Sequence, residues 1–186
     1  MAFLQIITRT FGQRPEMLKR NRASLDALTS RDWEQTIVED TEGRGVSWAN
    51  QNLQHVLATG DYVWVLDDDD VCALPELVEE LREAVNKHLP PVVVMWAYHE
   101  KWGMLPDDEH WGKAPTLGKC GFSNFFIRGD VWNAERAVFA NFACYAADYE
   151  FANHLWKQGY QFEWHDALAA WYPQQSNGAV EVEDAL

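Results

Sequence analysis

The sequence predicts an α/β domain in which helices cover both faces of a mostly parallel central sheet. Short apolar runs alternate along the chain with stretches whose apolar residues recur at helical spacing, and the links between them are short. Such alternation favours parallel strands joined by right-handed crossovers, which gives three layers. Because 186 residues suffice for one substantial core, we expect a single domain over residues 1–186.

The first half of the chain, residues 1–98, carries the clearer pattern. Four apolar runs predict strands at residues 3–8, 33–38, 61–66 and 92–96. Three periodic stretches predict helices at residues 15–28, 46–58 and 74–88. Pro90 and Pro91 end the last of these helices, since proline cannot continue one.

The second half, residues 99–180, is less regular. Residues 100–119 are rich in Trp, Pro, Gly and Asp and predict a long loop. Beyond it we expect strands at residues 122–127 and 161–164, a helix from about residue 130 and a helix at residues 147–157. Residues 181–186 are expected to form a flexible tail.

Composition excludes several classes of protein. A net charge of −14 without a basic cluster argues against a partner that presents a nucleic-acid backbone. No apolar stretch is long enough to span a membrane, and the first residues lack the basic region of a signal peptide. The three cysteines contain no C-x-x-C pair, which predicts neither a disulfide framework nor a zinc site. We therefore predict a cytoplasmic protein.

The strongest chemical signal is a run of four carboxylates, Asp67 to Asp70, directly after the strand at residues 61–66. Ligands bind at the carboxyl ends of strands in open α/β sheets, and oxygen ligands suit Mg²⁺ or Mn²⁺. The alternative is a solvated acidic turn that caps the following helix. From the charges alone, both interpretations stay open.

Several segments in the same order resemble the family 2 glycosyltransferases. Residues 6–15 (IITRTFGQRP) are similar to the family's first strand and nucleotide loop, although Arg9 stands where the family usually has proline. Thr36 to Asp40 is similar to the second strand, and residues 52–62 to the stretch that leads into the metal motif. Leu66 followed by the four aspartates matches the L-D-x-D-D form of the D-x-D motif.

The resemblance implies a GT-A fold and assigns residues 1–98 to the nucleotide-sugar donor. The donor-binding residues that it implies are Thr8, Arg9, Thr10, Arg14, Asp40, Asn52, Asp67 and Asp68. Asp67 and Asp69 would hold Mn²⁺ or Mg²⁺, with His165 as a further ligand. For Asp40 the alternative is a turn residue before a glycine loop, and for His165 it is ordinary packing.

Residues 99–180 would then hold the acceptor and the catalytic base. Residues 147–155 resemble the family's E-D segment, which makes Asp148 the candidate base, with Glu150 as the fallback. Trp96, Ser123 and Asn124 are the candidate contacts to the sugars. Asp148 could instead merely cap its helix, and the helix dipole would then lower its pKa.

These observations predict a metal-dependent glycosyltransferase that moves a sugar from a nucleotide diphosphate, with UDP favoured by resemblance, to a hydroxyl acceptor, with inversion. One alternative is a nucleotidyltransferase, which would normally have a more glycine-rich first loop than Thr10 to Arg14. The other is a noncatalytic module that binds nucleotide sugars, favoured by Ala147 standing in place of the expected Glu.

Overall fold

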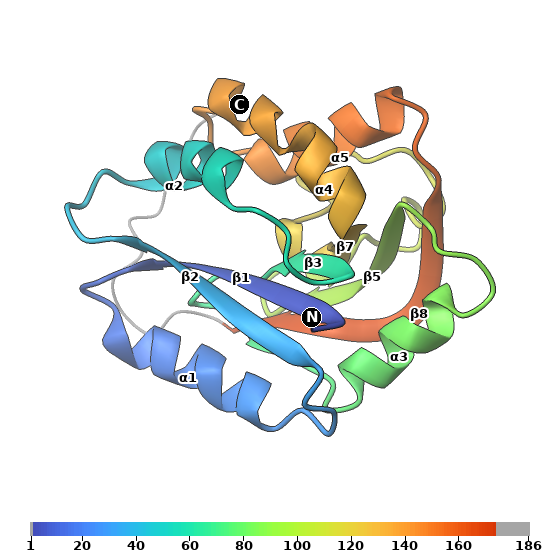
Figure 1. Ribbon diagram of the computed structural model, residues 1–186, viewed down its shortest axis with the longest axis horizontal. Helices are drawn as coiled ribbons and strands as arrows, with labels where there is room; N and C mark the ends of the chain where they lie inside the picture. The colour runs from blue at the N-terminus through green and yellow to red at the C-terminus, as the bar shows by residue number, and fades with distance from the viewer. Residues whose placement is uncertain (1, 174–186) are drawn as a thin grey trace.

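A strongly curled sheet runs through the middle of the molecule, with helices on both faces (Figure 1). The computed structural model describes residues 2–173, and the predicted tail at residues 181–186 lies outside them. The three-layer α/β architecture is thus confirmed. The strands are β1 (Leu4–Phe11), β2 (Trp33–Asp40), β3 (Tyr62–Val65), β4 (Val71–Cys72), β5 (Val92–His99), β6 (Gly103–Leu105), β7 (Phe125–Arg128) and β8 (Phe162–Tyr172).

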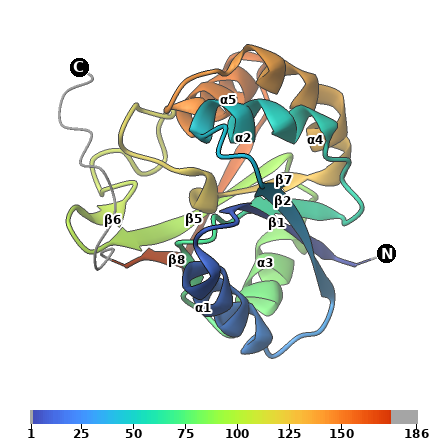
Figure 2. The ribbon, with the colours of Figure 1, turned by 90° about the vertical axis from the view of Figure 1, so that its left-hand side faces the viewer.

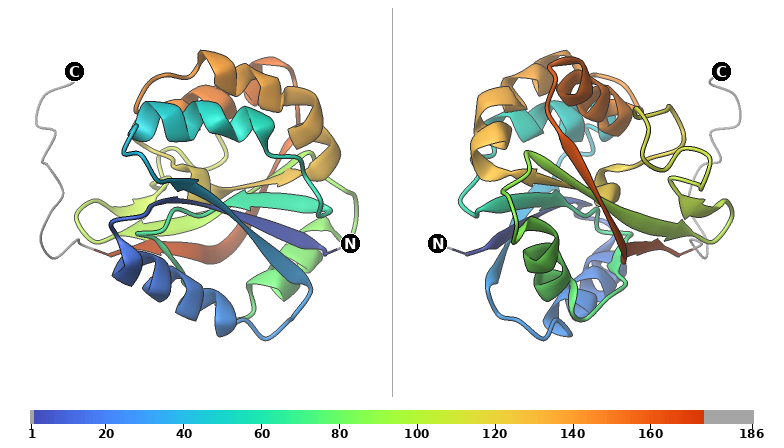
Figure 3. Two further views of the ribbon diagram at one scale, coloured as in Figure 1. Left: turned by 60° about the vertical axis from the view of Figure 1, so that its left-hand side comes forward. Right: turned by 90° about the vertical axis from the view of Figure 1, so that its right-hand side faces the viewer.

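The helices divide between the two faces. On one face lie α1 (Pro15–Asp26) and α3 (Leu77–Val85), and on the other α2 (Val46–Asn52), α4 (Gly129–Glu135) and α5 (Ala147–Lys157) (Figures 2 and 3). Each face has its own apolar core, and Trp64 and Leu81 belong to the first, Trp132 and Phe151 to the second. Short 3-10 helices at Leu53–His55, Phe122–Asn124 and Arg136–Asn141 complete the described elements.

The sheet is mixed rather than mostly parallel. Its strand order is β2-β1-β3-β7-β5-β8-β4, with β6 beside β5. The pairs β1–β2, β1–β3 and β5–β8 are parallel, as the sequence predicts. However, β7 is antiparallel to both β3 and β5. The segment between β5 and β7 contains no helix that would carry the chain back across the sheet, so β7 starts at the end where β5 finishes.

The last strand differs most from its prediction. The sequence predicts residues 161–164, whereas β8 runs from Phe162 to Tyr172. Its charged residues, such as His165 and Asp166, and its alanines hide the strand because alanine and aspartate have low β-propensity. The extra length matters for function, because Trp171 pairs with Val71 of β4, immediately after the four aspartates.

Smaller differences concern boundaries. The helix predicted at residues 46–58 ends at Asn52, and the predicted loop at residues 100–119 includes the hairpin strand β6. The strand predicted at residues 122–127 begins with a 3-10 turn and becomes extended at Phe125. Within residues 2–173, every helix is too short or too polar to cross a bilayer.

Candidate active site

The four aspartates form a tight turn at the carboxyl end of β3, which we call the acid turn (Asp67–Asp70). Backbone bonds fix it to β1, since the Asp68 amide donates to the Arg9 carbonyl, and the Asp70 amide closes the turn on the Asp67 carbonyl. The buried side chain of Asn21, from α1, donates from Nδ2 to the carbonyls of Asp67 and Asp70, both at 3.0 Å. The turn is therefore a rigid structure held from two sides.

The side chain of Asp68 is buried and helps to hold the acid turn in place. Its carboxylate is fully buried and accepts a hydrogen bond of 2.7 Å from the Thr10 hydroxyl, and it forms an ion pair of 2.8 Å with Arg14. Burial raises the pKa of Asp68, and the Thr10 and Arg14 contacts oppose this rise. Both side chains are buried and bond to each other, and their contacts with a nucleotide stay a prediction.

Asp67 is held by Arg9, whose guanidinium binds it with two nitrogens, Nε at 2.6 Å from Oδ1 and Nη2 to Oδ2. A third nitrogen of Arg9 donates to Asn50 Oδ1, and the guanidinium lies 4.8 Å from the centre of the Phe122 ring. Asn50 in turn donates to the Cys144 carbonyl at 2.6 Å. Arg9 thus links the acid turn to α2 and to the segment before α5, and it offsets part of the negative charge.

Oxygens of Asp67, Asp69 and Asp70 converge, with one atom from each lying within 4.8 Å of the others. Burial first, and then the neighbouring carboxylates, raise the pKa of Asp69 and raise that of Asp70 strongly. A cluster of hard oxygen donors whose mutual repulsion is only partly offset fits Mg²⁺ or Mn²⁺. Asp67 retains lone pairs for such an ion although both its oxygens accept from Arg9.

Asp148 enters the same region from the first turn of α5. Burial raises its pKa to about 6, although the Tyr149 amide, which donates to Oδ1 at 2.7 Å, and the charge of Arg9 lower it. The charge of Asp67 also raises the pKa of Asp148, so the two carboxylates lie close enough to interact. Burial therefore outweighs the contacts that lower the pKa of Asp148, so this carboxyl has a higher pKa than an exposed aspartate.

The end of β8 and the 3-10 turn before β7 supply the remaining wall. Ser123 donates to Asp70 Oδ2 at 3.1 Å. The hydroxyl of Tyr172 lies against Gly121, where an added Cβ would be 2.7 Å from Tyr172 Oη and 3.7 Å from Asp148 Oδ2. We call the group formed by the acid turn, Arg9, Ser123, Asp148 and Tyr172 the acid site.

Other predicted site residues are internal. Thr8 is fully buried and accepts from Gln35 Nε2 at 2.8 Å. Asn124 is fully buried and donates to the carbonyls of Met95 and Leu105, and its contact with a sugar stays a prediction. Asp40 is also buried; burial alone would raise its pKa, but the amides of the loop, including Gly45 at 2.8 Å, lower it. The structure thus supports the turn-residue alternative for Asp40.

Four more predicted residues lie outside the acid site or show no contact with it. His165 pairs with Glu80 of α3 at 2.8 Å and is not among the residues that converge at the acid turn, so its role as a metal ligand stays a prediction. Trp96 stacks on Trp111 with ring centres 3.7 Å apart and donates to an aspartate of β8. Asn52 and Glu150 are half-buried, Asn52 at the end of α2 and Glu150 on the first turn of α5.

Sequence reasoning missed four residues of the site. Asn21 has a visible signal, because it is a polar residue on the helix face that also carries Met17 and Leu25, four positions to either side. Asn50 lies two positions from Asn52, the residue that the resemblance suggested. Tyr172 and Gly121 carry no local signal, since their roles depend on how far β8 extends.

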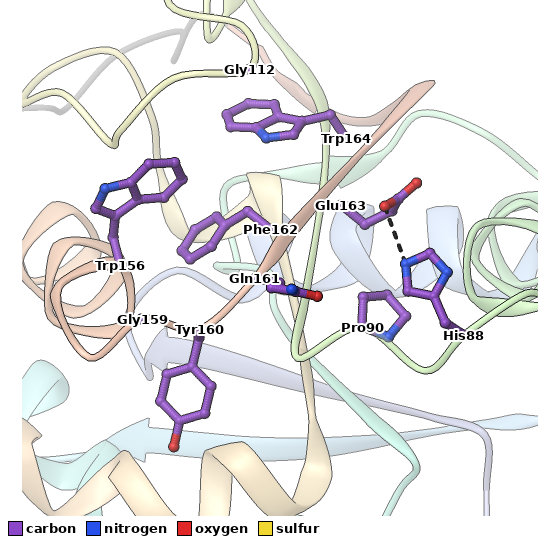
Figure 4. Close-up of a pocket in the computed structure, with 10 residues that line it drawn as sticks. All are labelled: His88, Pro90, Gly112, Trp156, Gly159, Tyr160, Gln161, Phe162, Glu163 and Trp164. Atoms are coloured by element: carbon purple, nitrogen blue, oxygen red, sulfur yellow. Dashed lines mark ion pairs between the residues drawn. The ribbon is translucent and has the colours of Figure 1, made fainter.

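A second concave region lies at the other end of β8. An open pocket of about 530 Å³ is lined by Trp156, Phe162 and Trp164 on one side of the strand and by Glu163 and His88 on the other (Figure 4). We call it the aromatic pocket. Its rings pack on each other, with Trp156 and Phe162 centres 5.1 Å apart, and Glu163 forms an ion pair with His88 at 3.3 Å.

Comparison with known proteins identifies the family. The model of the family described as "Glycosyl transferase family 2" matches residues 16–145, more than half of the chain. This chain belongs to glycosyl transferase family 2. A search of curated proteins found no match.

Solved structures share the fold of this family 2 chain at low sequence identity. TarS of S. aureus, in a fragment complexed with UDP-GlcNAc, superposes with a TM-score of 0.65 at 12% identity, covering 100% of this chain and 62% of that one. The mannosyltransferase PcManGT of Pyrobaculum calidifontis, in complex with GDP-Man and Mn²⁺, gives 0.57 at 15%, covering 93% and 58%. A glycosyltransferase involved in glycosylation of the major capsid of PBCV-1 gives 0.57 at 9%, covering 93% and 94%. The chain therefore spans about three fifths of the first two.

Proposed function

We propose that this chain transfers a sugar from a nucleotide-diphosphate sugar to a hydroxyl acceptor. The observation that carries the proposal is the acid site: converging carboxylates at the end of β3, faced by Asp148, a carboxylate with a pKa of about 6. Family membership and the nucleotide sugars named for TarS and PcManGT support the same chemistry. UDP is the favoured nucleotide by resemblance, and the predicted cytoplasmic location stays a prediction.

The acid turn would hold the donor through a divalent cation. Asp69 and Asp70, with the remaining lone pairs of Asp67, would ligate Mn²⁺ or Mg²⁺, and the bound ion would stabilise the charge of the departing diphosphate. Arg9 keeps Asp67 oriented, and Arg14 lies 3.4 Å from Asp69, so both cations limit the repulsion within the turn.

Asp148 would accept the proton of the acceptor hydroxyl. Its carboxylate stands on the first turn of α5, close enough to the acid turn for the charge of Asp67 to raise its pKa. A base on the side of the sugar opposite the leaving diphosphate produces inversion, so we propose an inverting transfer. The pKa of about 6 leaves most of Asp148 ionised at neutral pH while keeping it more basic than an exposed aspartate.

Nucleotide-sugar binding tests this proposal. Thermal shift would be recorded with UDP, UDP-GlcNAc, GDP and GDP-mannose, each with and without Mn²⁺, and release of free sugar would report hydrolysis. We expect stabilisation by at least one nucleotide sugar only with Mn²⁺, and loss of that shift in Asp69→Ala. The control Asp26→Ala removes an exposed carboxylate on α1 and should behave as wild type.

The outcomes separate the alternatives. Indifference to every nucleotide sugar with metal would refute the proposal. Binding without any hydrolysis or transfer, unchanged in Asp148→Asn, would favour the noncatalytic module. Release of diphosphate from a nucleoside triphosphate and a sugar phosphate would favour the nucleotidyltransferase.

A further inference from the structure

The Tyr172 hydroxyl is a polar group that the proposed transfer does not yet use. Its oxygen is buried, and no hydrogen bond of regular geometry satisfies it within residues 2–173. The side chain close enough to interact with it is Ser123, whose hydroxyl already donates to Asp70 and can therefore only accept from Tyr172, in a contact without regular geometry. Buried hydroxyls normally have partners, so one without a regular partner beside the acid turn indicates a ligand.

Gly121 makes room for this hydroxyl. An added Cβ at Gly121 would lie 2.7 Å from Tyr172 Oη, closer than real Cβ atoms approach. The backbone of Gly121 is extended, with φ −130° and ψ 173°, a conformation open to every residue. Space, rather than backbone conformation, therefore requires glycine here.

The hydroxyl also lies between the two functional parts of the acid site. The same point at Gly121 is 3.7 Å from Asp148 Oδ2, so Tyr172 Oη is at most about 6.4 Å from the candidate base, by adding the two distances. On its other side stand Ser123 and Asp70 of the acid turn. Burial, and then the charge of Asp70, raise the pKa of Tyr172 well above its usual value, so the group is a permanent donor.

We propose that Tyr172 selects the transferred sugar, its hydroxyl donating a hydrogen bond to a hydroxyl oxygen of the sugar held between the acid turn and Asp148. This inference rests on the proposed function, in which the diphosphate binds at the acid turn and the acceptor at Asp148. The sugar, which joins the two, must then occupy the space that Tyr172 Oη borders. A phenol in this position contacts the sugar and not the nucleotide.

The Tyr172→Phe variant tests the contact. Dissociation constants of UDP and UDP-GlcNAc, and of GDP and GDP-mannose, would be measured with Mn²⁺ by calorimetry. For the pair that wild type binds, Tyr172→Phe should weaken the nucleotide sugar about tenfold and leave the free nucleotide unchanged, the loss expected for one hydrogen bond to a buried partner. The control Tyr98→Phe, on the neighbouring strand β5 and 40% exposed, should change neither constant.

A steric pair tests the placement without any substrate. Gly121→Ala should lower the melting temperature because its Cβ meets the Tyr172 oxygen, and Tyr172→Phe should restore most of that loss in the double variant, since the next nearest ring atom is 3.6 Å away. In the double variant, which lacks the Tyr172 hydroxyl, the dissociation constants of nucleotide sugar and free nucleotide should still differ less than in wild type.

Each result decides a different point. Equal weakening of nucleotide and nucleotide sugar in Tyr172→Phe, or no weakening, would overturn the sugar contact while the transfer proposal stands. Equal melting temperatures for Gly121→Ala and the double variant would overturn the placement of the hydroxyl. Failure of wild type to bind any nucleotide sugar with Mn²⁺ would overturn the proposed function and this inference with it.

Discussion

The two ends of β8 lie in regions of opposite chemistry. At its carboxyl end, Tyr172 borders carboxylates whose pKa values are raised, and a buried hydroxyl lacks a regular partner. At its amino end, the aromatic pocket is open and has a volume of about 530 Å³, but its rings contact one another and its carboxylate is paired. Crowded carboxylates and an unmet hydrogen bond therefore lie at the carboxyl end, whereas the cited groups at the amino end have partners.

This difference shows that cavity size and chemistry need not coincide. Charged groups brought together against their mutual repulsion cost folding free energy, which a bound ligand can recover. Packed rings and an exposed ion pair cost little and leave little to recover. The proposed reaction belongs to the acid site on this ground, and we expect substitutions at the two ends to have very different effects.

The largest expected effect is that of Asp148→Asn. The amide keeps the shape of the side chain but cannot accept the acceptor proton, so turnover should fall about 10²- to 10⁴-fold. Calorimetry with Mn²⁺ and nucleotide sugar should give a dissociation constant close to that of wild type. Turnover within threefold of wild type would remove Asp148 from the role of base.

The pH dependence is expected next in size. Burial raises the pKa of Asp148 to about 6, and the base must be ionised. Below pH 6, kcat/KM should fall about tenfold for each pH unit, and above it the rate should level off. Nucleotide-sugar affinity should be measured over the same pH range. Protonation of the acid turn would weaken binding, whereas protonation of Asp148 would lower the rate and leave binding unchanged. A flat profile between pH 4.5 and 7.5 would contradict the assignment.

Removal of the Asn21 side chain should destabilise the acid turn, because Asn21 holds two of its carbonyls. Asn21→Ala leaves two carbonyls of the acid turn without their donor, which should lower the free energy of unfolding by about 2 kcal/mol. Chemical denaturation measures this, and metal-dependent nucleotide binding should weaken in parallel. The control Asn86→Ala, at an exposed position after α3, should change stability by less than about 0.5 kcal/mol. Equal effects of the two variants would show that the turn does not depend on Asn21.

Sequence reasoning reaches the acid end in part, because its charges are local. The aspartates follow a four-residue apolar strand directly, and Asp148 begins a well-patterned helix, so each is visible within ten residues of chain. Which aspartate does what is not visible, since the inward turn of Asp68 follows from its bond to Thr10, 58 positions away. Contacts between residues that are far apart in the sequence decide such roles.

The second half resists prediction for the same reason. Charged residues and alanines within β8 conceal its length, and with it the approach of Tyr172 to Asp70. His165 was placed near the metal by resemblance, but its position early in a long strand sets it beside α3 instead. The length of β8 therefore decides where both Tyr172 and His165 lie.

The smallest expected effect, at the aromatic end, is the sharpest test of the comparison. Glu163 and His88 are 41% and 53% exposed in their side chains, so their ion pair is screened by water and Glu163→Gln should change the free energy of unfolding by less than about 0.5 kcal/mol. Turnover and nucleotide-sugar affinity should stay within twofold of wild type. A loss of turnover above fivefold with unchanged stability would mean that the aromatic pocket binds substrate, because a change in folding could not then explain the lost turnover.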